Sequence, residues 1–368
     1  MSQKLRIAQI TNCWESVPPQ NKGGLEQMVF YLCEGLSKLG HEVTLFGTAD
    51  SNISGKVVPI WPKAVSHDPY GRYLNTTNYT MWSVSEAFHH ASEFDIIHNH
   101  TSWVSGHFLG LINKPVVTTL HHPVGNPNDF LSQFPPEYKS YFDRIEHQHF
   151  SEGYVVSVSN NQGKYVSDLY RVIHNGIPQS EWLDNTSNSG SYLAYLGYIS
   201  GNKGVAEAIQ AVMPTTEKLK IAGAVMEHDL DSVRYFKEQV EPFIDADKIE
   251  YLGPINQADK KEFLKNAKAV LMPIQWEEPF GLVAIEALAC GTPVIANNRG
   301  ALPEIIENGI NGFLVNSVEE MTTKIAEVDK IDRRNCRKRF EENFTAERMV
   351  ANYEKLYSDI IRDYSLRK

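Results

Sequence analysis

The chain has 368 residues, of which 42% are hydrophobic and 22% charged, and its formal net charge is −10. These fractions exclude a disordered or collagen-like chain, and the acidic balance argues against binding of nucleic acid through a basic surface. The length favours two domains. No apolar run approaches the roughly 18 residues of a membrane span, and four scattered cysteines argue against a disulfide framework or a zinc ribbon.

Short apolar runs alternate with helical stretches in the first half of the chain. An amphipathic helix is predicted at Leu25–Leu39, and Gly40 favours its end. Because Arg6 interrupts the first apolar run, that run indicates a strand and not a signal peptide. The predicted strands are Leu5–Ile10, His41–Phe46, Asp95–His98, Pro115–Thr119 and Gly153–Val158. This alternation is typical of a parallel sheet covered by helices.

A second alternating series begins near Tyr192. Its predicted strands are Tyr192–Gly197, Leu219–Ala222, Ile249–Leu252, Ala269–Met272 and Pro293–Ala296. The polar segment 178–191 predicts a linker between two α/β domains. The predicted domains are 1–180 and 181–345, with a last helix over 346–368 that packs back onto the first. In such sheets, ligands bind in the loops that follow the strands.

The segment Trp276–Val294 carries the most informative pattern. Glu278 lies on a loop, a helix follows from Gly281, and Glu286 lies just over one turn inside that helix. The first amides of a helix lack partners within the helix and favour an anion. A carboxylate on either side suits a ligand with phosphate and hydroxyl groups. Each glutamate alone is more typical of a helix-stabilising or exposed carboxylate, and it is the whole string that favours a ligand site.

Two further loops contain candidate ligand-binding residues. Gly23 and Gly24 follow the first strand and begin a helix, so the backbone there can approach a ligand closely. Lys203 follows the first strand of the second series, where a lysine can neutralise a diphosphate. A flexible loop and a solvated lysine are the plain alternatives.

Four histidines follow strands, namely His98, His100, His121 and His122. Such a cluster is found in metal-dependent hydrolases. A neutral histidine that donates to a sugar hydroxyl or a phosphate is a second interpretation, and a structural histidine bonded to carbonyls is a third. The pattern leaves all three open.

Taken together, these motifs resemble the retaining nucleotide-sugar glycosyltransferases of the GT-B fold, family 4 (group 1). The string EPFGLVAIEALACGTPVIA carries most of the resemblance, supported by RGALPE at 299–304, NGFLV at 311–315 and VIHNGI at 172–177. The resemblance covers nearly the whole chain. It implies two Rossmann-like doubly wound domains that face a central cleft, with the acceptor-side domain first and the donor-binding domain second.

The resemblance implies a role for each matching residue. Glu278 would lie by the donor sugar, and Glu286 would bind the ribose hydroxyls. Lys203 and the backbone of Gly24 would meet the diphosphate. His121 would face the reacting sugar.

Backbone groups complete the implied site. Amides of the helix start would meet the sugar hydroxyls and the diphosphate, and the backbone around Ile255 would meet the base. Those amides belong to Phe280, Gly281, Leu282 and Val283. One departure concerns Tyr198, which stands where the family usually has an arginine. Because a phenol supplies no guanidinium charge, diphosphate binding would depend on Lys203 and the helix start.

The implied activity is transfer of a hexose from a nucleoside diphosphate sugar, most often UDP-linked, to a hydroxyl acceptor in polysaccharide, glycolipid or glycoconjugate biosynthesis. No metal, cofactor or nucleic acid is expected. A non-hydrolysing nucleotide-sugar epimerase and a non-catalytic nucleotide-binding homologue are the alternatives. The sequence leaves open whether the acceptor is a sugar, a lipid-linked group or a small molecule, and leaves the oligomeric state open.

Two other segments bear on location and acceptor. The basic run Arg333–Arg339 favours a solvated helix face, with contact to anionic lipid as the alternative. The aromatic segment Trp61–Trp82 suits either an acceptor site or loop packing. We expect a cytoplasmic protein, and peripheral contact with the inner membrane face stays open.

Overall fold

The computed structural model describes residues 4–20, 23–73, 75–124, 135, 153–166, 169–182, 186–187, 190–226 and 229–366. The chain forms two compact units, one of Met1–Gly176 with Ala346–Lys368 and the other of Ile177–Thr345. The chain therefore passes between the units at 176–177 and at 345–346. The segment 178–191, predicted as a linker, lies within the second unit, where Trp182 is buried.

The first unit contains a seven-stranded parallel sheet in the order β3-β2-β1-β4-β5-β6-β7. Its strands are β1 (Arg6–Ile10), β2 (Glu42–Thr48), β3 (Lys56–Trp61), β4 (Ile96–Asn99), β5 (Val116–Leu120), β6 (Tyr154–Ser157) and β7 (Leu169–Val172). The five predicted strands are confirmed. The edge strands β3 and β7 were missed because their patterns are weak, and Pro59 interrupts β3. The strand order reverses between β1 and β4, which creates a switch point there.

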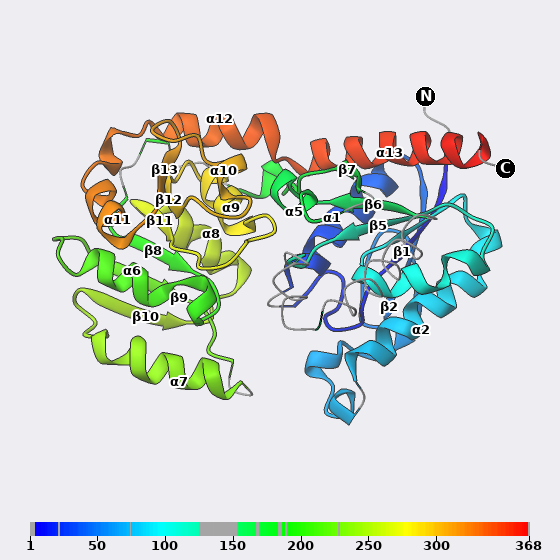
Figure 1. Cartoon of the computed structure of the whole chain (residues 1–368), viewed down its shortest axis with the longest axis horizontal. Coiled ribbons are helices and arrows are strands. Elements are labelled where there is room, and N and C mark those ends of the chain that lie inside the picture. The colour runs from blue at the N-terminus through cyan, green and yellow to red at the C-terminus, as the bar shows by residue number, and fades with distance from the viewer. Residues whose placement is uncertain are drawn as a thin grey trace. The chain divides into compact units, whose positions relative to one another are not determined.

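Helices cover the first sheet. They are α1 (Gly24–Lys38), α2 (Thr76–His89), α5 (Asn160–Gly163) and α13 (Ala346–Leu366), with 3-10 turns η1 (Val65–His67), η2 (Gly71–Tyr73), η3 (Ala91–Glu93) and η4 (Ser102–Leu111). The predicted last helix is confirmed as α13, which packs along α1 (Figure 1). Gly35 permits this close approach, because a β-carbon there would collide with Val350.

The second unit contains a six-stranded parallel sheet in the order β10-β9-β8-β11-β12-β13. Its strands are β8 (Leu193–Leu196), β9 (Leu219–Ala222), β10 (Ile249–Gly253), β11 (Ala269–Met272), β12 (Val294–Asn297) and β13 (Gly312–Val315). The five predicted strands are confirmed. Among the described strands of this unit, β13 was missed, because residues 312–315 were assigned to a motif and not to a strand. Both units therefore have the doubly wound α/β fold that the sequence predicts.

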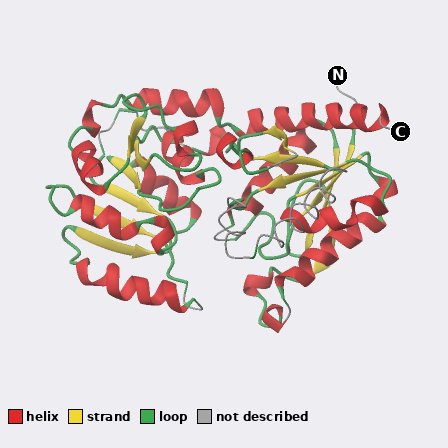
Figure 2. Cartoon of the chain, in the orientation of Figure 1, coloured by secondary structure: helices red, strands yellow, loops and turns green. Residues whose placement is uncertain are grey.

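Helices lie on both faces of the second sheet (Figure 2). They are α6 (Val205–Val212), α7 (Leu230–Gln239), α8 (Gln257–Lys265), α9 (Leu282–Ala289), α10 (Leu302–Ile305), α11 (Val318–Ile325) and α12 (Arg333–Asn343), with 3-10 turns η5 (Gln179–Glu181), η6 (Gly201–Lys203), η7 (Glu241–Phe243) and η8 (Val328–Lys330). Within the described part of the chain, no helix is both long and apolar enough to cross a membrane.

The basic run at 333–339 begins α12, and three of its arginines contact other residues of the second unit. Arg333 is buried and donates to the carbonyl of Ala267, and Arg337 donates to the carbonyl of Trp182. Arg339 forms an ion pair with Glu307. The prediction of a solvated basic face was therefore wrong for these three arginines, which stabilise the second unit instead.

Candidate functional site

Two loops of the second unit meet at its switch point, where β8 pairs with β11 and the strand order reverses. Lys203 lies in the loop after β8, and Glu278 lies in the loop after β11. The amide of Gln275 donates to the carbonyl of Asn202 over 2.9 Å and ties the loops together. The carboxyl edge of a parallel sheet at such a point is where ligands of this fold class bind.

The centre of this site is an ion pair between Lys203 and Glu278. The Lys203 Nζ lies 2.6 Å from Oε2 of Glu278, and Nε1 of Trp276 donates to the same oxygen over 2.8 Å. The ammonium also lies 4.7 Å from the centre of the Trp276 ring, where the ring face attracts a cation. The structure thus brings together the predicted sugar carboxylate and the predicted diphosphate lysine, and it adds Trp276.

A glycine allows a third loop to support Glu278. Gly300 follows β12 with φ of +61°, and a β-carbon there would collide with the backbone of Glu278. The amide of Ala301 donates to the Glu278 carbonyl over 2.9 Å. Backbone contacts from two directions therefore fix the loop that carries the carboxylate.

The helix predicted after Gly281 is confirmed as α9. Gly281 precedes it with φ of +106°, and no side chain caps its first turn. Phe280 is buried and its ring lies 6.0 Å from that of Phe344, which anchors the helix start. The first amides, at Leu282 and Val283, have no acceptor within an α-helix and favour an anion.

A second ion pair lies between two helices of the same unit. Glu286 of α9 is 8% exposed, and its Oε1 lies 2.5 Å from Nζ of Lys260 in α8. The Lys260 ammonium also lies 5.4 Å from the centre of the buried Trp182 ring. The sequence predicted Glu286 but not Lys260, because nothing distinguishes that lysine within the lysine-rich stretch of α8.

The two remaining predicted positions of the second unit lie in the loops that follow β8 and β10. Tyr198 is 38% exposed, and its carbonyl accepts a hydrogen bond from the Tyr195 hydroxyl over 3.0 Å. Ile255 is half-buried in the loop between β10 and α8, and Asn256 caps α8 directly after it. The Ile255 loop therefore leads into the helix that carries Lys260.

In the first unit, Gly24 begins α1, and two buried carboxyl groups lie at the same helix start. Glu26 accepts hydrogen bonds from its own amide and from that of Glu15. Burial, reinforced by the charge of Glu15, raises the pKa of Glu26 to about 7. Oε2 of Glu15 lies 3.1 Å from Nε2 of His67, whereas Oε1 has no hydrogen-bond partner among the described residues. The sequence did not indicate this cluster.

Three of the four predicted histidines, His98, His100 and His121, form hydrogen bonds with one another or with neighbouring side chains. The Nδ1 of His100 lies 2.9 Å from Nε2 of His121, and both nitrogens of His98 also have partners. The other nitrogen of His100 contacts Gln9. Neither His98 nor His100 therefore has a nitrogen free to coordinate a metal, and no metal-ligating group of three or more occurs among the described residues.

The aromatic segment of the first unit divides into a packed part and an exposed part. Trp61 stacks on Trp82 with ring centres 6.2 Å apart, and Tyr79 is buried against both. Tyr70 and Tyr73 are 71% and 79% exposed. Loop packing therefore explains Trp61, Tyr79 and Trp82, whereas Tyr70 and Tyr73 are accessible to an acceptor.

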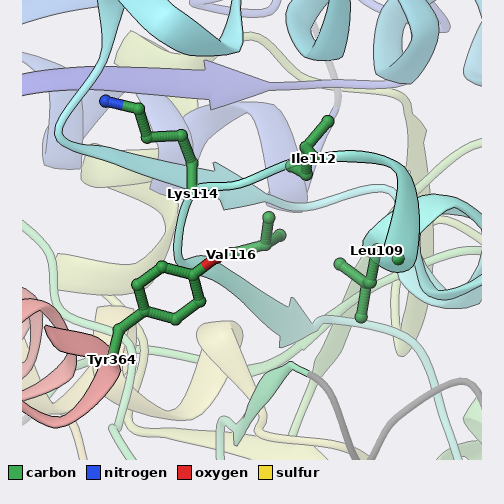
Figure 3. A pocket seen from close by; sticks show the side chains of 6 residues that line it. Leu109, Ile112, Lys114, Val116 and Tyr364 are labelled. Atoms are coloured by element: carbon green, nitrogen blue, oxygen red, sulfur yellow. The ribbon is translucent and has the colours of Figure 1, made fainter. Parts of the chain in front are cut away.

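A cavity of about 280 Å³ lies elsewhere in the first unit, between β5 and α13 (Figure 3). Its lining consists of Leu109, Gly110, Ile112, Lys114, Val116 and Tyr364. None of these is a predicted site residue. The Lys114 ammonium donates a hydrogen bond to the carbonyl of Phe94.

Comparison with known proteins identifies two family models that together span most of the chain. Residues 149–346 match the model of "Glycosyl transferases group 1", and residues 22–181 match "Glycosyltransferase Family 4". A glycosyltransferase of Methanocaldococcus jannaschii, named as uncharacterised, is 27% identical over 84% of this chain and 85% of its own length.

Solved structures have the same fold at low identity. Anabaena HepE in complex with UDP and glucose gives a TM-score of 0.70 at 18% identity, covering 96% of this chain and 99% of HepE. The catalytic domain of starch synthase IV from Arabidopsis thaliana, bound to ADP and acarbose, gives 0.72 at 14% identity, covering 98% of this chain and all of that domain. The fold is GT-B, as predicted.

Proposed function

Because the chain belongs to the group 1 glycosyl transferases, we propose that it transfers a sugar from a nucleoside diphosphate sugar to a hydroxyl acceptor, with retention of anomeric configuration. The observation that carries the proposal is the Lys203–Glu278 ion pair at the switch point of the second unit, in the loop that leads to the uncapped start of α9. A cation, a carboxylate and free amides suit a ligand with both phosphate and hydroxyl groups.

In this mechanism the protein stabilises the leaving group. The bond between the anomeric carbon and the diphosphate oxygen breaks, and negative charge grows on the diphosphate. Lys203 and the amides at Leu282 and Val283 would stabilise that charge. The acceptor oxygen attacks from the same face, and the departing phosphate takes its proton, which gives retention. Glu278 would orient the sugar without forming a covalent bond.

The remaining contacts to the donor follow from the second ion pair. Glu286 would accept from the ribose hydroxyls, with its carboxylate held by Lys260. The backbone of Phe280 and Gly281 would contact the sugar hydroxyls, and the Ile255 loop would meet the base. We propose UDP as the nucleotide. The structure of HepE in complex with UDP and glucose supports this choice. The starch synthase, which is bound to ADP, favours adenine as the base instead.

We further propose that the reaction needs no metal or other cofactor, because Lys203 and the α9 amides supply positive charge at the diphosphate. In the first unit, Gly24 would approach the diphosphate and His121 would face the reacting sugar. The acceptor would be a sugar, a lipid-linked group or a small molecule. We propose that the enzyme acts in the cytoplasm. Transfer to a lipid-linked acceptor would indicate contact with the inner membrane face.

The direct test combines nucleotide binding with transfer. Thermal unfolding is measured with UDP, GDP and ADP, where a ligand at about 100 times its Kd stabilises by about 2.7 kcal/mol. The nucleotide that raises Tm defines the donor panel, and the anomeric configuration of the product is read by NMR. Transfer that survives chelation of divalent ions, with retention, supports the proposal. An inverted product or a trapped glycosyl adduct on Glu278 contradicts the mechanism.

Tyr198 favours a second candidate, a homologue that binds nucleotide without catalysis, because this position lacks the arginine charge usual in the family. That protein would show a nucleotide-induced rise in Tm but no transfer with any donor. Interconversion of the sugar nucleotide without an acceptor would instead identify an epimerase.

A further inference from the structure

Seven side chains of the first unit form one continuous hydrogen-bonded chain at the switch point between β1 and β4. Each contacts the next in the order His121, His100, Gln9, Tyr357, His98, Thr119 and Tyr353. Six of them are at most 2% exposed, and only His121 is half-buried. The chain thus joins the histidine after β5 to two tyrosines of the carboxyl-terminal helix α13.

No charged group belongs to this hydrogen-bonded chain of seven side chains. Among the described residues, the hydrogen-bond partners of its members include no carboxylate, lysine or arginine. The rings of His98 and His100 are 3.9 Å apart, so a proton on one would place a charge against the other in a buried site. Burial lowers the pKa of both well below 6.5 and that of His121 to about 3. Each ring therefore carries a single N–H at neutral pH.

The amide of Gln9 gives the chain a direction. Its Nε2 donates to the Tyr357 hydroxyl over 3.2 Å, so its Oε1 accepts from Nε2 of His100 over 2.7 Å. A neutral imidazole has one donor nitrogen, which leaves Nδ1 of His100 as an acceptor. The hydrogen bond to that atom must then come from Nε2–H of His121.

We propose that this chain holds His121 as the neutral Nε2–H tautomer, so that its Nδ1 accepts a hydrogen bond from a hydroxyl of the bound sugar. Among the described residues, Nδ1 of His121 has no other partner. A bare nitrogen accepts from a hydroxyl but repels an ionised phosphate oxygen, which has no proton to donate. The inference rests on the proposed function and defines the group that His121 recognises.

The other half of the chain makes Tyr357 a positioning residue. Its hydroxyl accepts from Gln9 and donates to Nδ1 of His98 over 2.7 Å, so that Nε2–H of His98 donates to Thr119 over 2.7 Å. Without that hydroxyl, nothing in the chain keeps the Gln9 amide in its orientation. A flipped amide would donate to His100, reverse the donors and place the proton of His121 on Nδ1.

The experiment determines the tautomer of His121 directly in the whole protein. With histidine rings labelled by ¹⁵N, long-range ¹H–¹⁵N spectra distinguish a protonated from a bare ring nitrogen, and His121→Gln assigns the signals. We expect protonated Nε2 and bare Nδ1 in the free protein. Tyr357→Phe should shift a measurable fraction to Nδ1–H. Tyr79→Phe, which removes a buried hydroxyl bonded to the Gly71 carbonyl outside the chain, should not.

A wild-type protein with protonated Nδ1 overturns the inference, and so does an unchanged tautomer in Tyr357→Phe. Gln9→Met replaces the first variant if Tyr357→Phe does not fold, with the same expectation. In the transfer assay, Tyr357→Phe should lower kcat/KM for the donor by up to about tenfold, the equivalent of one hydrogen bond to the bound sugar. Because the spectrum needs no substrate, inactivity towards every donor contradicts the proposed function and leaves the tautomer assignment intact.

Discussion

The two units place polar groups at the ends of their strands in opposite ways. In the second unit the groups are charged and reach the surface, as the Lys203–Glu278 pair shows with side chains 24% and 14% exposed. In the first unit they are neutral and buried, as in His100 and Gln9. A partly solvated cation can exchange a carboxylate partner for a phosphate at modest cost. A buried neutral chain cannot accept charge, so it fixes the direction of hydrogen bonds.

Charged groups and hydrogen bonds of fixed direction therefore lie in different units of the molecule. In the proposed mechanism, the second unit binds the diphosphate, whose negative charge grows as the bond to the sugar breaks. In the proposed tautomer, His121 of the first unit binds a hydroxyl group, which differs from an ionised phosphate by having a proton to donate. Substitutions in the two units should therefore fail in different ways.

The largest effect is expected from Lys203→Gln. The amide keeps most of the length of the side chain but removes the charge opposite the leaving diphosphate, so we expect kcat/KM to fall about 10²–10³-fold, as for loss of one preorganised oxyanion contact. Steady-state transfer assays with the donor identified by thermal shift measure the change. Lys218→Gln, which removes an exposed lysine paired with Asp247 in the same unit, should leave the rate unchanged. Loss of less than threefold in Lys203→Gln would contradict its assignment.

A buried charge in the first unit should instead affect stability. The folded pKa of Glu26 is about 7, above the ordinary 4.5, so the folded state binds the proton more tightly. Below pH 4.5 the carboxyl is protonated in both states. As pH rises from 4.5 to 7, only the unfolded state ionises and stability is lost, by about 3 kcal/mol above pH 7. Glu26→Gln, which cannot ionise, should have a Tm above wild type at pH 8 and equal to it near pH 4.5.

The matched control for this prediction is Glu342→Gln, at an exposed position of α12. It should change Tm equally little at both pH values. A Glu26→Gln variant that is less stable than wild type at pH 8 would show that the ionised carboxylate is stabilised in the folded protein, and would contradict the raised pKa.

The sequence predicted the elements with strong apolar patterns and the residues that share a motif. Every predicted strand is present, because buried parallel strands are short apolar runs, whereas β3 and β7 at the sheet edges lack that pattern. Trp276 could have been predicted, since an indole two residues before Glu278 lies in the same loop. Lys260 could not, because its role depends on the packing of α8 against α9.

The neutral chain of the first unit was beyond prediction for the same reason. The sequence offered metal coordination as one interpretation of His98 and His100. Nothing local in the sequence indicates that residues 9, 98, 100 and 357 meet. Their contact depends on the parallel register of β1 and β4 and on the packing of α13, which arise only from the tertiary fold.

The smallest predicted effect concerns the Lys260–Glu286 ion pair and tests whether Lys260 contacts the nucleotide or only holds Glu286. Glu286→Gln should weaken nucleotide binding about tenfold, because one of two acceptor oxygens is lost. Lys260→Met keeps apolar contact with Trp182 but releases the carboxylate, and should weaken binding about threefold by loss of orientation. If Lys260 acts only through Glu286, the double variant should bind as weakly as Glu286→Gln alone, a coupling that titration of each variant with the nucleotide would measure. Additive losses of about thirtyfold would mean that Lys260 contacts the nucleotide itself, and the ribose site would then contain a cation as well as a carboxylate.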